Sequence, residues 1–198
     1  MIMARLAALV LTLVSALSTS YAADVYRNEL AGFQLSTPPG WHVVDPALNL
    51  KTVKSQKLND EQQRAELRKY SSRLLLILSK YPPSFRGLNP TLKIDLKPSE
   101  GKTPMAMMES LIPVFQKGFK QFKIVQVPSE ATLGGVTGAY FQGTYQLVVR
   151  RSSYPAASEM WILPHQGGFL VIGANTSQTE KDGARQEMLD AVSSLALF

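Results

Sequence analysis

The chain has 198 residues, of which 45% are apolar and 18% are charged, and its formal net charge is +6. These values are ordinary for a folded globular protein and provide enough apolar residues for a sizeable core. The absence of cysteine excludes disulfide bonds, cysteine metal ligands and the N-terminal acylation of a lipoprotein. The stability of the protein must therefore come from its core alone.

Residues 1–22 have the pattern of a secretory signal peptide. Arg5 is followed by the apolar run Leu6–Leu17 and then by the small residues Ser20 and Ala22, at the two positions that a signal peptidase inspects. The run is shorter than the ~20 apolar residues that a spanning helix needs, and no second long run follows. We therefore predict cleavage near Ala22 and a soluble periplasmic or secreted protein, with residues 23–198 as a single globular domain.

Apolar patterning predicts strands in the first half of the mature chain. Alternation indicates half-buried strands, and the continuous run Leu74–Leu78 favours a strand that is covered on both faces. Turn residues such as Pro38, Pro39 and Gly40 separate these segments. The expected strands cover residues 32–36, 41–44, 74–78 and 91–96.

Two amphipathic helices are predicted in the second half. Thr103 and Pro104 are a capping hydroxyl and a first-turn proline, and an apolar stripe continues to Phe119. Pro113 lies inside this stripe and should kink the helix or end its first half. A capping box at residues 177–180 predicts that the final helix begins there and runs to about Leu195.

Four further strands are expected between these helices, at residues 122–127, 139–150, 158–163 and 169–175. The last two are joined by residues 165–168, whose glycines suit a hairpin turn. Strands in hairpin-capable runs favour an antiparallel sheet. We therefore expect an α+β fold, an α/β/α sandwich with a mainly antiparallel six- to seven-stranded sheet and helices on both faces.

A set of local phrases in a fixed order resembles the PsbP-like family, the thylakoid-lumen accessory proteins of photosystem II and their bacterial relatives. The phrases are Gly32-Phe33-Gln34-Leu35, Pro39-Gly40-Trp41, Leu88-Asn89-Pro90 and Leu133-Gly134-Gly135-Val136, followed by the terminal amphipathic helix. The resemblance spans nearly all of the mature chain. It implies an α/β/α sandwich and a non-enzymatic binding or assembly role, and the basic segment at residues 51–73 is not part of it.

The chain contains no recognisable catalytic or metal-binding motif. Its two histidines, His42 and His165, have no partner histidine at ligand spacing, so we expect one strand residue and one exposed turn residue. Asp95 and Glu159 fall in predicted strands, where a hydrolase with paired carboxylates would need them to face one cleft. We therefore expect no catalytic residues, no cofactor and no metal.

The basic residues are concentrated in one part of the chain. Residues 51–86 hold nine basic and three acidic residues, and a predicted helix at 59–73 is capped by Asn59 and Gln62. The expected contact residues for a partner are Lys57, Arg64, Arg68 and Arg73. Such a surface could bind an acidic envelope protein or anionic lipid headgroups, or it could simply be solvated. Nucleic acid is not expected, because no stacking aromatic residues accompany these arginines.

Three functions remain open at this stage. The first is an exported, non-catalytic binding or accessory protein that recognises an envelope partner or an anionic surface. The second is a carrier for a small molecule or lipid, which would need a cavity of about 300 Å³ or more between sheet and helix. Met108, Phe115 or Trp41 would line that cavity. The third is a hydrolase, which would need a histidine beside a serine and a carboxylate.

Overall fold

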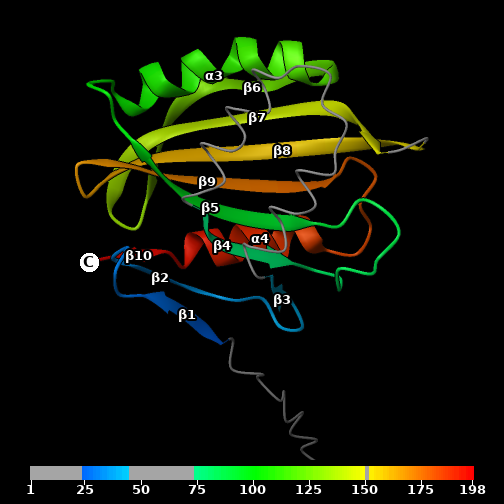
Figure 1. Ribbon diagram of the computed structural model, residues 1–198, viewed down its shortest axis with the longest axis horizontal. Coiled ribbons are helices and arrows are strands. Elements are labelled where there is room, and N and C mark those ends of the chain that lie inside the picture. The colour runs from blue at the N-terminus through cyan, green and yellow to red at the C-terminus, as the bar shows by residue number, and fades with distance from the viewer. Residues whose placement is uncertain (1–23, 45–73, 150–151) are drawn as a thin grey trace, which may run out of the picture.

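The computed structural model describes residues 24–44, 74–149 and 152–198, shown in Figure 1. The predicted signal peptide at residues 1–22 and the basic segment at residues 51–73 lie outside the described residues. No described helix combines the length and the apolar character needed to cross a lipid bilayer.

Most described strands belong to one antiparallel seven-stranded sheet, as the sequence predicted. Their order across the sheet is β3-β4-β5-β9-β8-β7-β6. The strands are β3 (His42–Val43), β4 (Leu74–Ser79), β5 (Thr91–Pro98), β6 (Lys120–Leu133), β7 (Val136–Val149), β8 (Ser152–His165) and β9 (Gly168–Ser177). Strands β6 to β9 are longer than predicted, because hairpin pairing continues to the turns, where side chains are no longer buried in alternation.

A second, three-stranded sheet was not predicted. It has the order β1-β2-β10 and consists of β1 (Val25–Asn28), β2 (Phe33–Ser36) and β10 (Ala196–Leu197). Phe33 and Leu35 of β2 are completely buried and belong to the larger core cluster of the described residues. The two ends of the described chain therefore close one face of the large sheet together.

The helices α3 (Pro104–Gly118) and α4 (Ala184–Ser193) pack against opposite faces of the large sheet. In Figure 1, α3 lies over β6 and β7. Helix α4 contacts β9 of the large sheet and β2 of the small one. Met108 of α3 packs in one core cluster with Phe141 and Ile162, and Met188 of α4 packs in the other with Trp161. The expected sandwich with helices on both faces is confirmed.

Helix α3 begins as predicted. The Thr103 hydroxyl accepts a hydrogen bond from the Ala106 amide at 3.2 Å, and Pro104 is the first helical residue. The helix continues through Pro113 to Gly118, so the expectation that this proline could end its first half is wrong. Pro113 lies on the exposed face, where water can hydrogen-bond to the carbonyl group that the proline leaves free.

Helix α4 begins six residues later than predicted, with Gly183 instead of Ser177 at its N-cap and Ala184 as its first residue. Ser177 is still part of β9 and pairs with Ala156, so it cannot cap a helix. The helix amides are instead satisfied by Asp182, which accepts from the Ala184 amide at 3.2 Å, and by Glu180, which accepts from the Arg185 amide. The predicted capping box is wrong because sheet pairing competes for the same residues.

Candidate functional site

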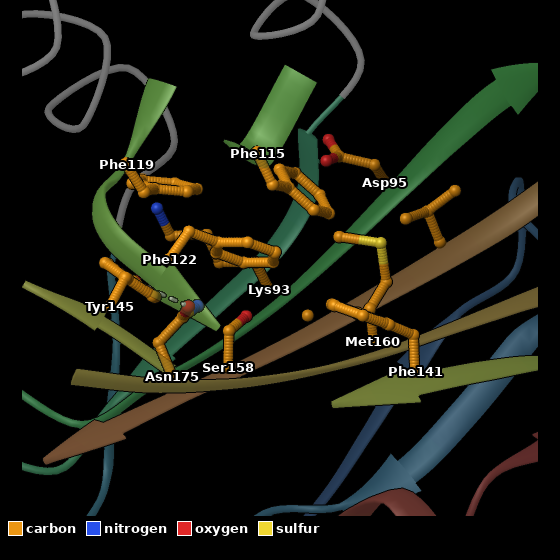
Figure 2. Close-up of a pocket in the computed structure, with 12 residues that line it drawn as sticks. Lys93, Asp95, Phe115, Phe119, Phe122, Phe141, Tyr145, Ser158, Met160 and Asn175 are labelled. Carbon is orange, nitrogen blue, oxygen red and sulfur yellow. Dashed lines mark hydrogen bonds between the residues drawn. The ribbon is translucent and has the colours of Figure 1, made fainter. Parts of the chain in front are cut away.

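A cavity of about 170 Å³ lies between α3 and the large sheet, as Figure 2 shows. Helix α3 packs mainly on β6, β7 and β8, and residues at its C-terminal end line the cavity together with residues of β5 and β9. The lining residues come from α3 and its C-terminal cap and from five strands of the sheet, so only the tertiary fold assembles the site.

Aromatic side chains form the wall of this pocket. They are Phe115, Phe119, Phe122, Phe141 and Tyr145. Phe119 stacks on Tyr145 with ring centroids 4.2 Å apart, and Phe122 and Phe141 lie 6.0 Å apart. A Cβ atom at Gly143 would lie 2.9 Å from the Phe122 ring, so only glycine at this position allows the ring to rest on the sheet. The wall is therefore built by contacts among residues distant in sequence.

The floor of the pocket is a row of paired residues across three strands. Lys93 of β5 pairs with Gly173 of β9, which pairs with Met160 of β8. A Cβ atom at Gly173 would meet no heavy atom within 4 Å, and its backbone does not have a positive φ. The missing side chain of Gly173 leaves the hollow between Lys93 and Met160.

Polar groups lie at one end of the floor. Asn175 and Ser158 are directly paired on β9 and β8, and the Tyr145 hydroxyl donates to Asn175 Oδ1 at 3.4 Å. Burial raises the pKa of Tyr145 to about 12, so this hydroxyl stays protonated at neutral pH. Figure 2 shows Lys93 reaching from β5 toward this end, where Phe119 and Tyr145 lie.

The surroundings of Lys93 disfavour the charged form of its side chain. Burial lowers the pKa of its ammonium group, and the negative charge of Asp95 only partly opposes this shift. Lys93 makes no hydrogen bond or ion pair with a described residue, whereas Asp95 has Lys97 at 3.9 Å. Burial also raises the pKa of Asp95, and its Oδ1 atom has no hydrogen-bond partner within the described ranges.

Sequence reasoning identified only part of this site. Phe115 lines the pocket as the carrier hypothesis expected, but Met108 is fully buried in the core and Trp41 lies elsewhere. Lys93 and Gly173 were missed. The alternation of β5 does place Lys93 and Asp95 on one face, but the sequence does not show that α3 covers the neighbouring strands on that face.

The residues considered for catalysis are separated. Asp95 lies on the α3 face, whereas Glu159 is buried on the α4 face, where it binds Tyr140 and Arg185. His42 is exposed in β3. His165 is half-buried at the end of β8 with Nε2 2.6 Å from the Ala31 carbonyl oxygen, so its expected place in an exposed turn is wrong.

The hairpin turn beside His165 consists of Gln166 and Gly167, with φ angles of 47° and 74°. His165 pairs with Gly168 across the strands, and its side chain contacts the β1–β2 connection at Ala31.

Among the described residues, no cluster of three or more histidine, aspartate or glutamate side chains could hold a metal ion. The expected contact residues Lys57, Arg64, Arg68 and Arg73 lie outside the described residues.

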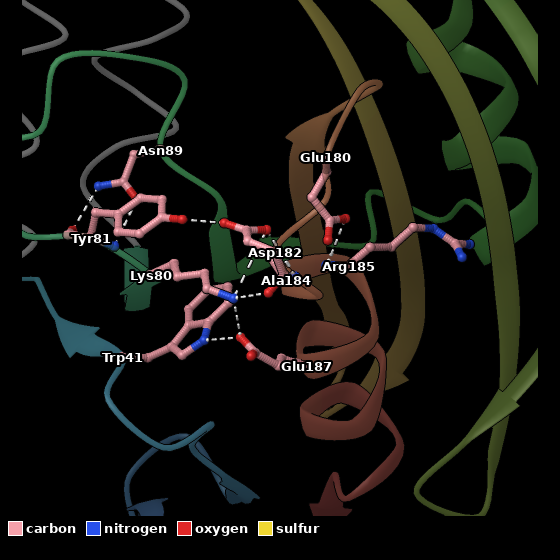
Figure 3. A network of polar contacts seen from close by, with 9 residues as sticks. All are labelled: Trp41, Lys80, Tyr81, Asn89, Glu180, Asp182, Ala184, Arg185 and Glu187. Carbon is pink, nitrogen blue, oxygen red and sulfur yellow. Dashed lines mark hydrogen bonds and ion pairs between the residues drawn. The ribbon is translucent and has the colours of Figure 1, made fainter.

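A second polar cluster, shown in Figure 3, joins α4 to the β3–β4 edge of the sheet. Glu187 of α4 accepts hydrogen bonds from Trp41 Nε1 at 2.7 Å and from Lys80 Nζ at 2.9 Å. Lys80 also donates to the Asp182 carbonyl oxygen at 2.7 Å, and the Tyr81 hydroxyl donates to the Asp182 carboxylate. These polar groups satisfy one another's hydrogen bonds, so the cluster has a structural role: it holds α4 against the β3–β4 edge, and we call it the α4 clamp. Trp41 takes part in it from the position directly before β3.

Comparison with known proteins supports the fold. No protein-family model and no curated protein matches the chain. LpqN of Mycobacterium tuberculosis, a protein involved in cell envelope biogenesis, matches with a TM-score of 0.51 at 14% identity, over 90% of this chain and 87% of LpqN. Cyanobacterial PsbP (CyanoP) from Synechocystis matches with a TM-score of 0.48 at 15% identity, over 94% and 99%. The likeness to LpqN concerns the fold alone, and membership of the PsbP-like family stays a prediction.

Proposed function

We propose that this protein is a non-catalytic binding protein that holds a small, largely apolar ligand in the pocket between α3 and the sheet. The observation that carries the proposal is the pocket itself, an aromatic wall over a glycine hollow with a few polar groups at its end. Binding sites for small molecules combine a mostly apolar lining with a few placed polar groups in this way.

The size of the cavity restricts the ligand. At about 170 Å³ it is smaller than the roughly 300 Å³ expected of a general carrier, so a lipid would not be enclosed. An engineered apolar cavity of about 150 Å³ accommodates benzene, which is close to this volume. The proposed ligand therefore has one ring or a similarly small apolar body.

A non-catalytic role is supported by the arrangement of the titratable groups. The described histidine that is partly buried, His165, contacts a backbone carbonyl oxygen and lies away from the pocket lining. The signal-peptide pattern of residues 1–22 favours action outside the cytoplasm, and LpqN, which has a similar fold, is involved in cell envelope biogenesis. An accessory role in the envelope, with partner contacts through the basic segment, is proposed on the same grounds.

The substitution Gly173→Leu tests the pocket directly. A Cβ atom at position 173 has open space around it, so the variant should fold. The leucine side chain would fill the hollow, so the variant should lose binding. Binding of four one-ring compounds would be followed by ligand-observed NMR: toluene, phenylacetamide, phenethylamine and phenylacetate. Gly118→Ala is the matched control, because Gly118 also has open space around its Cβ position but does not line the pocket.

The proposal predicts that the wild type and Gly118→Ala bind at least one of these compounds and that Gly173→Leu, with an unchanged circular dichroism spectrum, binds none. Equal binding by Gly173→Leu, or no binding of any compound by the wild type, would overturn it.

A further inference from the structure

We propose that the ligand is a monoanionic carboxylate with a small apolar body, and that Lys93 is its counter-ion. This inference rests on the proposed binding function and names the chemical class that the same pocket selects.

The charges around the pocket leave one positive charge to be neutralised. Asp95 has Lys97 as its ion-pair partner, while Lys93 has no ion pair with a described residue. Lys93 and Asp95 are two positions apart on β5, which corresponds to a rise of about 6.6 Å. Figure 2 shows Asp95 at the other end of the pocket, beside Phe115. A ligand with one negative charge would pair with Lys93 and remain apart from Asp95.

Neutral donors accompany Lys93 at this end. Asn175 Oδ1 already accepts from the Tyr145 hydroxyl, so the amide nitrogen of Asn175 is the group left for a ligand. Ser158 is paired directly with Asn175, and its hydroxyl makes no hydrogen bond with a described residue. A carboxylate has two oxygens that each accept hydrogen bonds, so an ammonium, an amide and a hydroxyl match its requirements.

The remainder of the pocket suits an apolar body. Met160, Phe122 and Phe141 border the hollow above Gly173, and their side chains offer no hydrogen-bond donor. A ring or short aliphatic chain would lie against these side chains while the carboxylate contacts Lys93. A second negative charge on the ligand would be directed toward Asp95 and be repelled, which limits the ligand to a monoanion.

The test compares three ligands that share a benzyl group. Phenylacetate carries the negative charge, phenylacetamide is its neutral analogue and phenethylamine carries a positive charge. Each would be titrated by NMR into wild type, Lys93→Met and Gly173→Leu at neutral pH. Lys181→Met is the matched control, because Lys181 is exposed, lies outside the pocket lining and changes the net charge equally. Thermal melting establishes that each variant is folded.

Phenylacetate should bind wild type about tenfold or more tightly than phenylacetamide, the effect of one charge-assisted contact. Lys93→Met should remove that preference while keeping the binding of phenylacetamide, and Lys181→Met should keep it. Equal binding of the two compounds by wild type, an unchanged preference in Lys93→Met, or a preference for phenethylamine would overturn the carboxylate assignment and leave the proposed function standing. If no compound binds wild type, or if Gly173→Leu binds the compounds as tightly as wild type does, the proposed function fails as well.

Discussion

The buried contact between α4 and β8 gives a stability prediction whose size can be worked from the structure. Glu159 has a side-chain exposure of 7% and accepts from Arg185 Nε at 2.6 Å and from the Tyr140 hydroxyl at 2.6 Å. Substituting Arg185→Leu leaves a buried carboxylate with one neutral donor. Full removal of a partner from a buried pair costs about 3–5 kcal/mol. Arg185 is 46% exposed, so we expect about 2–3 kcal/mol here.

Substitution of the other partner, Glu159, should lower the free energy of unfolding by less. Glu159→Gln leaves the exposed Arg185 to be solvated and keeps a carbonyl oxygen for Tyr140, so we expect about 1 kcal/mol. For a domain of this size the loss in Arg185→Leu corresponds to about 5–10 °C in Tm. Urea unfolding measures both free energies. Equal costs for the two variants, or a cost below about 0.5 kcal/mol for Arg185→Leu, would refute the assignment of a buried, charge-assisted contact.

Two further predictions concern the α4 clamp and the basic segment. Burial raises the pKa of Asp182, but the hydrogen bond from the Tyr81 hydroxyl opposes this and contributes to a net lowering of that pKa in the folded protein. The Asp182 carboxylate therefore stabilises the fold fully at pH values above its pKa in the unfolded chain. This stabilisation is lost as the pH falls through the pKa of Asp182 in the folded protein. Stability measured between about pH 5 and pH 2 should therefore fall less steeply in Asp182→Asn. Affinity capture from the envelope fraction should lose its partner in Arg64→Glu/Arg68→Glu and at high salt. A partner retained by that variant would contradict the assignment of the basic segment as the contact surface.

Local signals predicted much of the fold. Thr103 and Pro104 set the start of α3 because their side chains act on the adjacent helix backbone, which requires no tertiary contact. Apolar patterning located most strands of the large sheet because burial of one or both faces leaves a period in the sequence. The start of α4 was not predictable in this way, because β9 recruits Ser177 for pairing with β8.

The pocket was not predictable from local patterns. Lys93 reads as a solvent-facing residue in an alternating strand, and Gly173 reads as a simple interruption of an apolar strand. Only the pairing of β5, β9 and β8 places Lys93, Gly173 and Met160 in one row, and only the packing of α3 adds Phe115 to their boundary. Residues that are close in space but distant in sequence produce no periodic pattern in the sequence, so sequence analysis cannot detect that they form a pocket.

The sequence by itself determined the class of the fold, the antiparallel sheet and the apolar faces of both helices, since these depend on neighbouring residues and on burial. The tertiary structure alone decided which polar residues lose their water. It covers Glu159 with α4 and gives it Arg185, and it places Lys93 in an aromatic pocket without a counter-ion among the described residues. Desolvation depends on what packs above a residue, and that is a property of the assembled layers.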